Sequence, residues 1–150
     1  MKQNKRALAA FAALLIPAGA GMLLGQTRSV FVITDAEGVS GVCRQEQTDP
    51  ADAEMRALLA GEVNAAVQGF LDGGADEVVV WDGHDGSRSL SALTIHPKAK
   101  LLMGAPGATM TMERHYSAMA FIGQHAMAGV QNGVMGHSYS SLGIQNMLLN

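Results

Sequence analysis

The sequence predicts an α/β fold in which a mainly parallel sheet is flanked by helices. Short apolar runs rich in β-branched residues are typical of strands that are buried on both faces. One long segment between the first two runs has the periodicity of a helix, and polar, glycine-containing segments follow the runs directly. Alternation of strand and helix favours a parallel sheet, whose binding sites form beyond the carboxyl ends of its strands.

The first expected strand covers residues 29–34, an apolar run that ends at the charged segment 35–38. Later parts of the chain show weaker versions of the same pattern, and each is expected to add one element. The further expected strands are 77–81, 100–103 and 118–123, with a short helix at 109–116, a turn or strand at 134–138 and a last strand at 144–149.

The clearest expected element is the long helix that follows residue 48. Thr48 or Asp49 can cap its first turn, and Pro50 suits that turn. Gly73 and Gly74 are expected to end it, because glycine accepts the left-handed conformation of a helix cap. Apolar residues recur along it at three- and four-residue steps and predict one buried stripe: Met55, Leu58, Leu59, Val63, Ala66, Val67, Phe70 and Leu71.

Residues 1–28 have the composition of a secretory signal. Lys2, Lys5 and Arg6 precede an uncharged stretch over residues 7–24 that contains small residues suited to cleavage. An uncleaved anchor is the alternative, since the uncharged stretch is of borderline length for a membrane span. The sequence therefore predicts export to the periplasm or the extracellular space, with membrane contact only through this segment.

The composition excludes several classes of protein. Of the 150 residues, 48% are hydrophobic and 15% are charged, which is too apolar for a disordered chain. The formal charge of −3 becomes −7 without residues 1–28, and no basic cluster indicates nucleic-acid binding. The single cysteine, Cys43, excludes an intrachain disulfide and a Cys-rich zinc site, and we expect it to be a small apolar filler.

Acidic and imidazole side chains follow three of the expected strands. Asp35-x-Glu37 comes after the first strand, Asp82-x-His84 after the second and His125 after the fourth. The carboxyl ends of parallel strands meet at one edge of a sheet, so these side chains are expected to lie together. Two carboxylates and two imidazoles suit zinc or a similar divalent ion, and a carboxylate between two ions can bridge them.

Other polar residues allow two interpretations. His137 lies twelve residues beyond His125 and can act as a general acid/base or nucleophile, but spacing alone favours a structural histidine bonded to a backbone carbonyl. Arg56 and Glu62 on the expected helix form a solvated face, or Glu62 supports the site from behind the metal ligands.

Four motifs in order resemble those of the DppA-type zinc D-aminopeptidases, a metallopeptidase family. The resemblance extends over residues 30–150 and includes a helix segment, Gly61 to Ala66. The motifs are Thr34-Asp35-Ala36-Glu37-Gly38-Val39-Ser40-Gly41, Trp81-Asp82-Gly83-His84-Asp85-Gly86, Phe121-Ile122-Gly123-Gln124-His125-Ala126 and Gly133-Val134-Met135-Gly136-His137-Ser138.

The resemblance implies a zinc-dependent aminopeptidase that removes N-terminal D-amino acids, such as D-alanine, from short peptides. It implies that Asp35 bridges two zinc ions and that Glu37, His84 and His125 complete parts of the two coordination shells. It also implies that His137 is the catalytic histidine, in place of the structural interpretation. Members of the family form ring-like homo-oligomers, so a homo-oligomer is expected.

The sequence also departs from the family. The family has a fifth metal ligand, a glutamate beyond the His137 motif, and no glutamate follows Glu113 here. We therefore expect a signal peptide or anchor at 1–28 and, at 29–150, an α/β metallopeptidase domain truncated at its C-terminus, the N-terminal fragment of a larger catalytic unit. A non-catalytic exported domain that binds peptide or metal is the alternative. A two-metal phosphatase ranks low, because no Arg or Lys cluster lies near the motifs.

Overall fold

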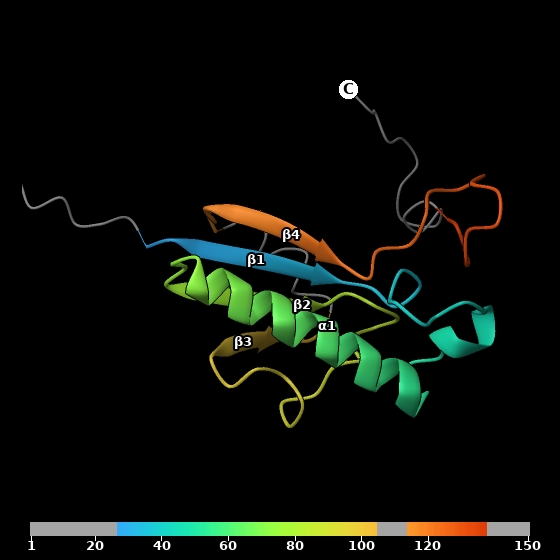
Figure 1. Ribbon diagram of the computed structural model, residues 1–150, viewed down its shortest axis with the longest axis horizontal. Helices are drawn as coiled ribbons and strands as arrows, with labels where there is room; N and C mark the ends of the chain where they lie inside the picture. The colour runs from blue at the N-terminus through green and yellow to red at the C-terminus, as the bar shows by residue number, and fades with distance from the viewer. Residues whose placement is uncertain (1–26, 105–113, 138–150) are drawn as a thin grey trace, which may run out of the picture.

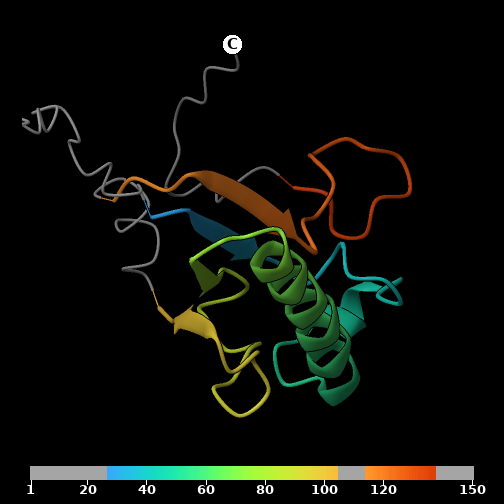
Figure 2. The same ribbon diagram turned by 60° about the vertical axis from the view of Figure 1, so that its left-hand side comes forward.

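The computed structural model describes residues 27–104 and 114–137 and confirms the α/β prediction. Four parallel strands form one sheet in the order β3-β2-β1-β4, and α1 lies against one face of it in both views (Figures 1 and 2). In chain order the elements are β1 (Ser29–Thr34), the 3₁₀ helix η1 (Gln45–Thr48), α1 (Ala53–Asp72), β2 (Glu77–Asp82), β3 (Ala99–Leu102) and β4 (Ala118–Ile122).

The central strand is β1, and all six of its residues are buried. It pairs in parallel with β2 on one side and β4 on the other, and its last residue, Thr34, stands opposite both Asp82 and Ile122. Three strands of the sheet therefore end side by side. The segments that follow them begin at the same edge, as the sequence pattern predicts.

The strand bounds agree with the sequence prediction to within one residue. The segment from Val134 to His137 forms a turn, whereas Arg114 to Tyr116 is not helical. The rest of the expected helix at 109–116 and the expected strand at 144–149 lie outside the described residues.

The start of α1 differs from the prediction. The cap is Asp52, whose Oδ1 accepts a hydrogen bond of 2.8 Å from the amide of Met55. Thr48 ends η1 instead, and Asp49 accepts a hydrogen bond from the amide of Ala51 in the turn between the two helices. The prediction that Thr48 or Asp49 caps the helix is therefore wrong, because both side chains are engaged in the preceding turn.

The apolar stripe of α1 packs on the sheet as expected. The helix side contributes five buried residues, and alternate residues of β1 and β2 meet them. The helix ends at Asp72, and Gly74 then takes the left-handed conformation with φ of +94°. The buried members on the helix are Met55, Leu59, Ala60, Val63 and Val67, and those on the two strands are Val30, Val32, Val78 and Val80.

The expectation for Cys43 is wrong. Its side chain is exposed rather than buried among apolar residues. The loop between β1 and η1 runs over the surface, and there the Cys43 amide donates a hydrogen bond of 2.9 Å to Oε1 of Gln47. The neighbouring Val42 is buried in the core, so within this loop it is Val42 rather than Cys43 that fills the apolar interior.

The predicted signal segment at 1–28 lies almost entirely outside the described residues, which begin at Thr27. Among the helices that the structure does describe, none combines the length and the apolar character that a membrane crossing needs. The division of the chain at residue 28 therefore stays a prediction.

The loops after β1 and β4 touch through their backbones. The amide of Asp35 donates to the carbonyl of Ile122 at 2.9 Å, and the amide of Gly38 donates to the carbonyl of Gly123 at 2.8 Å. Gly123 has φ of +69°, and a Cβ atom there would lie 2.2 Å from the Asp35 carbonyl oxygen. Only glycine allows this contact, which fixes the segment after β4 against Asp35.

We expect Gly123→Ala to destabilise the fold by more than about 2 kcal/mol, because it adds both a backbone clash and a strained positive φ. The matched control is Gly61→Ala in the middle of α1, where an added Cβ meets no atom within 4 Å. That change is expected to stabilise by about 0.5–1 kcal/mol. Urea denaturation measures both, and equal midpoints for the two variants would contradict the assigned contact.

Candidate metal centre

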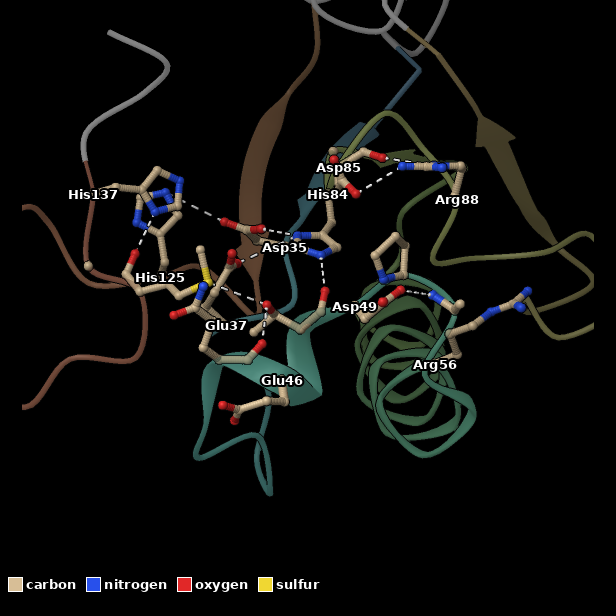
Figure 3. A pocket seen from close by; sticks show the side chains of 17 residues that line it. Asp35, Glu37, Glu46, Asp49, Arg56, His84, Asp85, Arg88, His125 and His137 are labelled. Carbon is tan, nitrogen blue, oxygen red and sulfur yellow. Dashed lines mark hydrogen bonds and ion pairs between the residues drawn. The ribbon is translucent and has the colours of Figure 1, made fainter.

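The edge of the sheet gathers the predicted ligands from two neighbouring strands. Asp35 follows β1 directly, Glu37 lies in the turn after it, and His84 follows β2. One ligand atom from each of the three lies within 4.8 Å of the other two. Figure 3 shows these three side chains converging in the middle of a pocket. The arrangement confirms that the strand ends bring these residues together.

His84 is the most strongly held of the three. Its Nδ1 lies 3.0 Å from Oδ1 of Asp35 and 3.6 Å from Oε2 of Glu37, and its Nε2 lies 2.7 Å from the carbonyl oxygen of Thr48. A carboxylate and a carbonyl both accept hydrogen bonds, so both ring nitrogens act as donors and the ring is an imidazolium. The protonated imidazole thus supplies a positive charge beside the two carboxylates, as a bound cation would.

The pKa of His84 follows from this environment. Burial lowers the pKa, but the hydrogen bonds to Asp35 and to the Thr48 carbonyl, with the negative charges of Glu37 and Asp35, outweigh burial and raise it to about 9. For Asp35, burial raises the pKa, but the hydrogen bond from His84 and the amide of Ala36 bring it below its ordinary value. The ion pair with His84 therefore stabilises the charged form of Asp35.

Glu37 has the opposite balance. Burial, and next its contact with Asp35, raise the pKa of Glu37 above its ordinary value. Its Oε2 is buried and accepts no hydrogen bond from the described residues. A buried carboxylate oxygen without a donor is costly, and a bound cation would satisfy it. The donor set and this oxygen therefore fit a divalent metal ion.

His125 lies at the other oxygen of Asp35. Its Nε2 is 3.6 Å from Oδ2, while its Nδ1 donates to the carbonyl of Ala126 at 2.8 Å. The side-chain Nε2 of Gln124 also donates to Oδ2, at 2.9 Å. Asp35 thus stands between His84 on Oδ1 and His125 on Oδ2, with one imidazole at each oxygen.

His137 joins the pocket through His125. The two imidazole rings stack with centroids 3.7 Å apart and planes 22° from parallel. Nδ1 of His137 donates to the carbonyl of Met135 at 2.6 Å, as the structural interpretation expects, and the side chain also lines the pocket. The structure therefore places His137 beside the cluster, on the same side as His125 in Figure 3.

Two further acidic residues near the site support loops. Oδ2 of the fully buried Asp82 accepts hydrogen bonds of 2.8 Å from the amides of Ser89 and Leu90. Glu62 on α1 accepts a hydrogen bond of 2.9 Å from the amide of Ser40, in the loop after β1. Glu62 therefore braces the segment that carries Asp35 and Glu37, which is the second of its two predicted interpretations.

Sequence reasoning missed three residues of the site. Gln124 received no role, although its place next to His125 is a local signal. Arg56 and Arg88 line the same pocket of about 1690 Å³ as the cluster. Arg56 was assigned to a solvated face, and no Arg cluster was expected near the motifs. No local pattern could have found this pair, because Arg56 lies on α1 and Arg88 lies on the loop after β2.

We expect the zinc-free chain to lose stability as the pH rises from about 6.5, the ordinary pKa of histidine, to about 9, its pKa in the fold. The imidazolium of His84 stabilises the folded state fully below the lower value, and this contribution disappears as the ring loses its proton. The slope is on the order of 1 kcal/mol per pH unit. Urea denaturation in the presence of a chelator measures it.

The variant His84→Gln should remove most of this slope, whereas His96→Gln, a histidine outside the pocket, should keep it. An unchanged slope in His84→Gln would show that the buried ion pair with Asp35 does not exist in solution.

Comparison with known proteins agrees with this geometry. The family model of the D-aminopeptidases, peptidase family M55, matches residues 29–150. A solved structure, the Zn-dependent D-aminopeptidase DppA from Bacillus subtilis, described as a self-compartmentalizing protease, matches with a TM-score of 0.63 and 28% identity. The match covers 75% of this chain and 43% of that one, so the chain spans less than half of that protein. A comparison with curated protein sequences gives no match. Since the family model covers the sheet, the cluster and all four motifs, the chain belongs to the D-aminopeptidase family.

Proposed function

We propose that the protein containing this chain is a zinc-dependent aminopeptidase that hydrolyses short peptides with N-terminal D-amino acids. The observation that carries the proposal is the cluster of Asp35, Glu37 and His84 in the middle of a large pocket. Membership of the D-aminopeptidase family supports the reaction class, and the zinc dependence of DppA supports the metal. Imidazole and carboxylate ligands suit zinc.

We propose two zinc ions for each site, with Asp35 as the ligand between them. The support is the position of this carboxylate, which has His84 at one oxygen and His125 at the other. Glu37 would complete the shell on the side of His84, where its Oε2 accepts no hydrogen bond from any described residue. Metal binding requires the His84 ring to release a proton, because a protonated nitrogen offers no lone pair.

Zinc bound here would polarise the scissile carbonyl and lower the pKa of the attacking water. The protein side chains supply the rest of the chemistry. Gln124 holds Asp35 in place through its side-chain Nε2, and the stack on His125 holds the ring of His137 at the pocket wall. From there His137 can take a proton from the attacking group and return it to the leaving amine.

Two further proposals concern the whole protein. We propose that residues 1–28 direct export to the periplasm or the extracellular space, supported by the basic start and the uncharged stretch that follows it. We also propose a homo-oligomer, supported by the description of DppA as self-compartmentalizing. Mass spectrometry of the mature N-terminus and sedimentation of the purified protein test the two separately.

The expected activity is release of D-alanine from D-alanyl-D-alanine by the zinc-loaded protein, abolished by a chelator and restored by zinc. Zinc content is measured by elemental analysis. Zinc and peptide binding without release of D-alanine would instead support the alternative of a non-catalytic binding domain. Absence of both zinc and hydrolysis would overturn the proposal.

Variants separate the two roles. Asp35→Ala should lose all bound zinc, since both proposed ions share this carboxylate. His137→Ala should keep its zinc and lose about 10²- to 10⁴-fold in kcat, the usual contribution of a general acid/base. His96→Ala, outside the pocket, is the matched histidine control and should keep both. Equal loss of zinc in Asp35→Ala and His137→Ala would contradict the assignment.

A further inference from the structure

The pocket that contains the metal centre also carries two guanidinium groups that the proposed chemistry does not use. Figure 3 shows Arg56 and Arg88 on one side of the pocket and His125 and His137 on the other. The cluster around His84 lies between them in this view. The two arginines therefore lie apart from the cluster of Asp35, Glu37 and His84, on a side of the pocket that Asp49 and Asp85 also line.

Arg56 lies in the first turn of α1 and is partly buried. Its Nε donates to the carbonyl of Ser89 at 3.3 Å. Within the described part of the chain, the two terminal nitrogens of the guanidinium have neither a hydrogen bond nor a carboxylate partner. Partial burial of a guanidinium without an anion is unfavourable. The planar guanidinium group can bind both oxygens of a carboxylate in a bidentate contact.

The position of Arg56 is coupled to the metal centre through β2. Ser89, whose carbonyl holds Arg56, is itself fixed because its amide donates to the buried Asp82 at the end of β2. His84 follows two residues after Asp82 on the same loop. One strand end therefore sets both the imidazole of the metal cluster and the carbonyl that orients the guanidinium.

Arg88 adds a second cation from the same loop. Its Nη2 pairs with Oδ2 of Asp85 at 2.9 Å, and the two side chains are 67% and 56% exposed. An exposed pair of this kind contributes little to stability and can exchange Asp85 for another anion at small cost. The guanidinium of Arg88 is therefore free to form a second contact with an anion that binds to Arg56.

A free peptide has complementary charges. Its N-terminal ammonium is positive and its C-terminal carboxylate is negative. The pocket offers the Asp35 and Glu37 carboxylates at the cluster and, away from them, the Arg56 guanidinium, which pairs with no carboxylate in the described part of the chain. Charge complementarity of this kind fixes the direction in which a ligand binds. The peptide would lie with its first residue at the cluster and its last residue toward Arg56.

We propose that Arg56, assisted by Arg88, binds the C-terminal carboxylate of the peptide whose N-terminal residue lies at the metal cluster. This inference rests on the proposed function and narrows its substrates to short peptides with a free carboxylate. A C-terminal amide or a much longer peptide would leave the guanidinium of Arg56 without its anion. Both arginines thus determine specificity rather than take part in the chemical step.

The test compares D-alanyl-D-alanine with its C-terminal amide as substrates of the zinc-loaded protein. The unsubstituted protein should prefer the free acid. Arg56→Gln should lower kcat/KM for the free acid by about 10- to 100-fold, mainly through KM, and change that for the amide by less than about twofold. Arg56→Lys keeps the positive charge but not the planar guanidinium, and its kcat/KM for the free acid should lie between those of the unsubstituted protein and Arg56→Gln. Arg88→Gln should lower kcat/KM for the free acid by a smaller factor than Arg56→Gln.

The matched control is Arg44→Gln, which removes an exposed arginine outside the pocket and should leave both substrates unchanged. Zinc content is measured for every variant, so that loss of the metal is not mistaken for loss of the carboxylate contact. Calorimetry on the His137→Ala protein adds a readout without turnover: it should bind the free acid more tightly than the amide, and Arg56→Gln in that background should abolish the difference.

The outcomes separate the two proposals. If D-alanine is released equally well from both peptides, and Arg56→Gln affects both equally, the inference is overturned while the proposed aminopeptidase stands. If the zinc-loaded protein releases D-alanine from neither peptide, the proposed function is overturned. In that case preferential binding of the free acid that depends on Arg56 would still support the carboxylate site, and equal binding of both peptides would overturn it.

Discussion

The candidate site depends on the parallel pairing of the central strand β1 on both of its sides. Because Thr34 stands opposite both Asp82 and Ile122, the chain leaves the sheet at one edge three times. Asp35, His84 and His125 all follow such exits within a few residues, so the hydrogen bonds of the sheet determine how close their side chains come. A shift of one residue in either register would turn the strand to its opposite face and separate them.

The electrostatics of the cluster follow from what this packing confines. Two carboxylates and one imidazolium are buried together, so the positive charge of His84 balances only one of the two acids. The pKa of Asp35 is lowered and that of Glu37 is raised, so the positive charge of His84 stabilises the Asp35 carboxylate more than the Glu37 carboxylate. A divalent ion in place of the proton would balance both carboxylates. The proton on His84 and the proposed metal therefore compete for one place, and the acidic body of the chain favours the cation.

The pocket has two different ends because separate contacts hold the His125 segment on one side of the cluster and Arg56 on the other. The backbone contact between Gly38 and Gly123 brings the His125 segment onto Asp35, on one side. On the other side, the loop after β2 folds back on α1, with Asp82 fixing Ser89 and Ser89 orienting Arg56. The shape of the pocket and its charge pattern thus have the same origin.

The sequence by itself determined the strands, the long helix and the cluster of carboxylates and imidazole at the sheet edge. Apolar β-branched runs are locally sufficient for the strands, and polar residues after parallel strands must meet at one edge, so Asp35, Glu37 and His84 were predictable. The local pattern failed where several neighbouring side chains were equally suited to one role. Asp52 caps α1, although Thr48 and Asp49 are residue types that also cap helices. Cys43 proved exposed because sequence does not show on which side of a loop the solvent lies. Only the tertiary structure placed Arg56 and Arg88 in the pocket, because contacts between distant segments depend on how the loops fold back on the sheet, which no local period encodes.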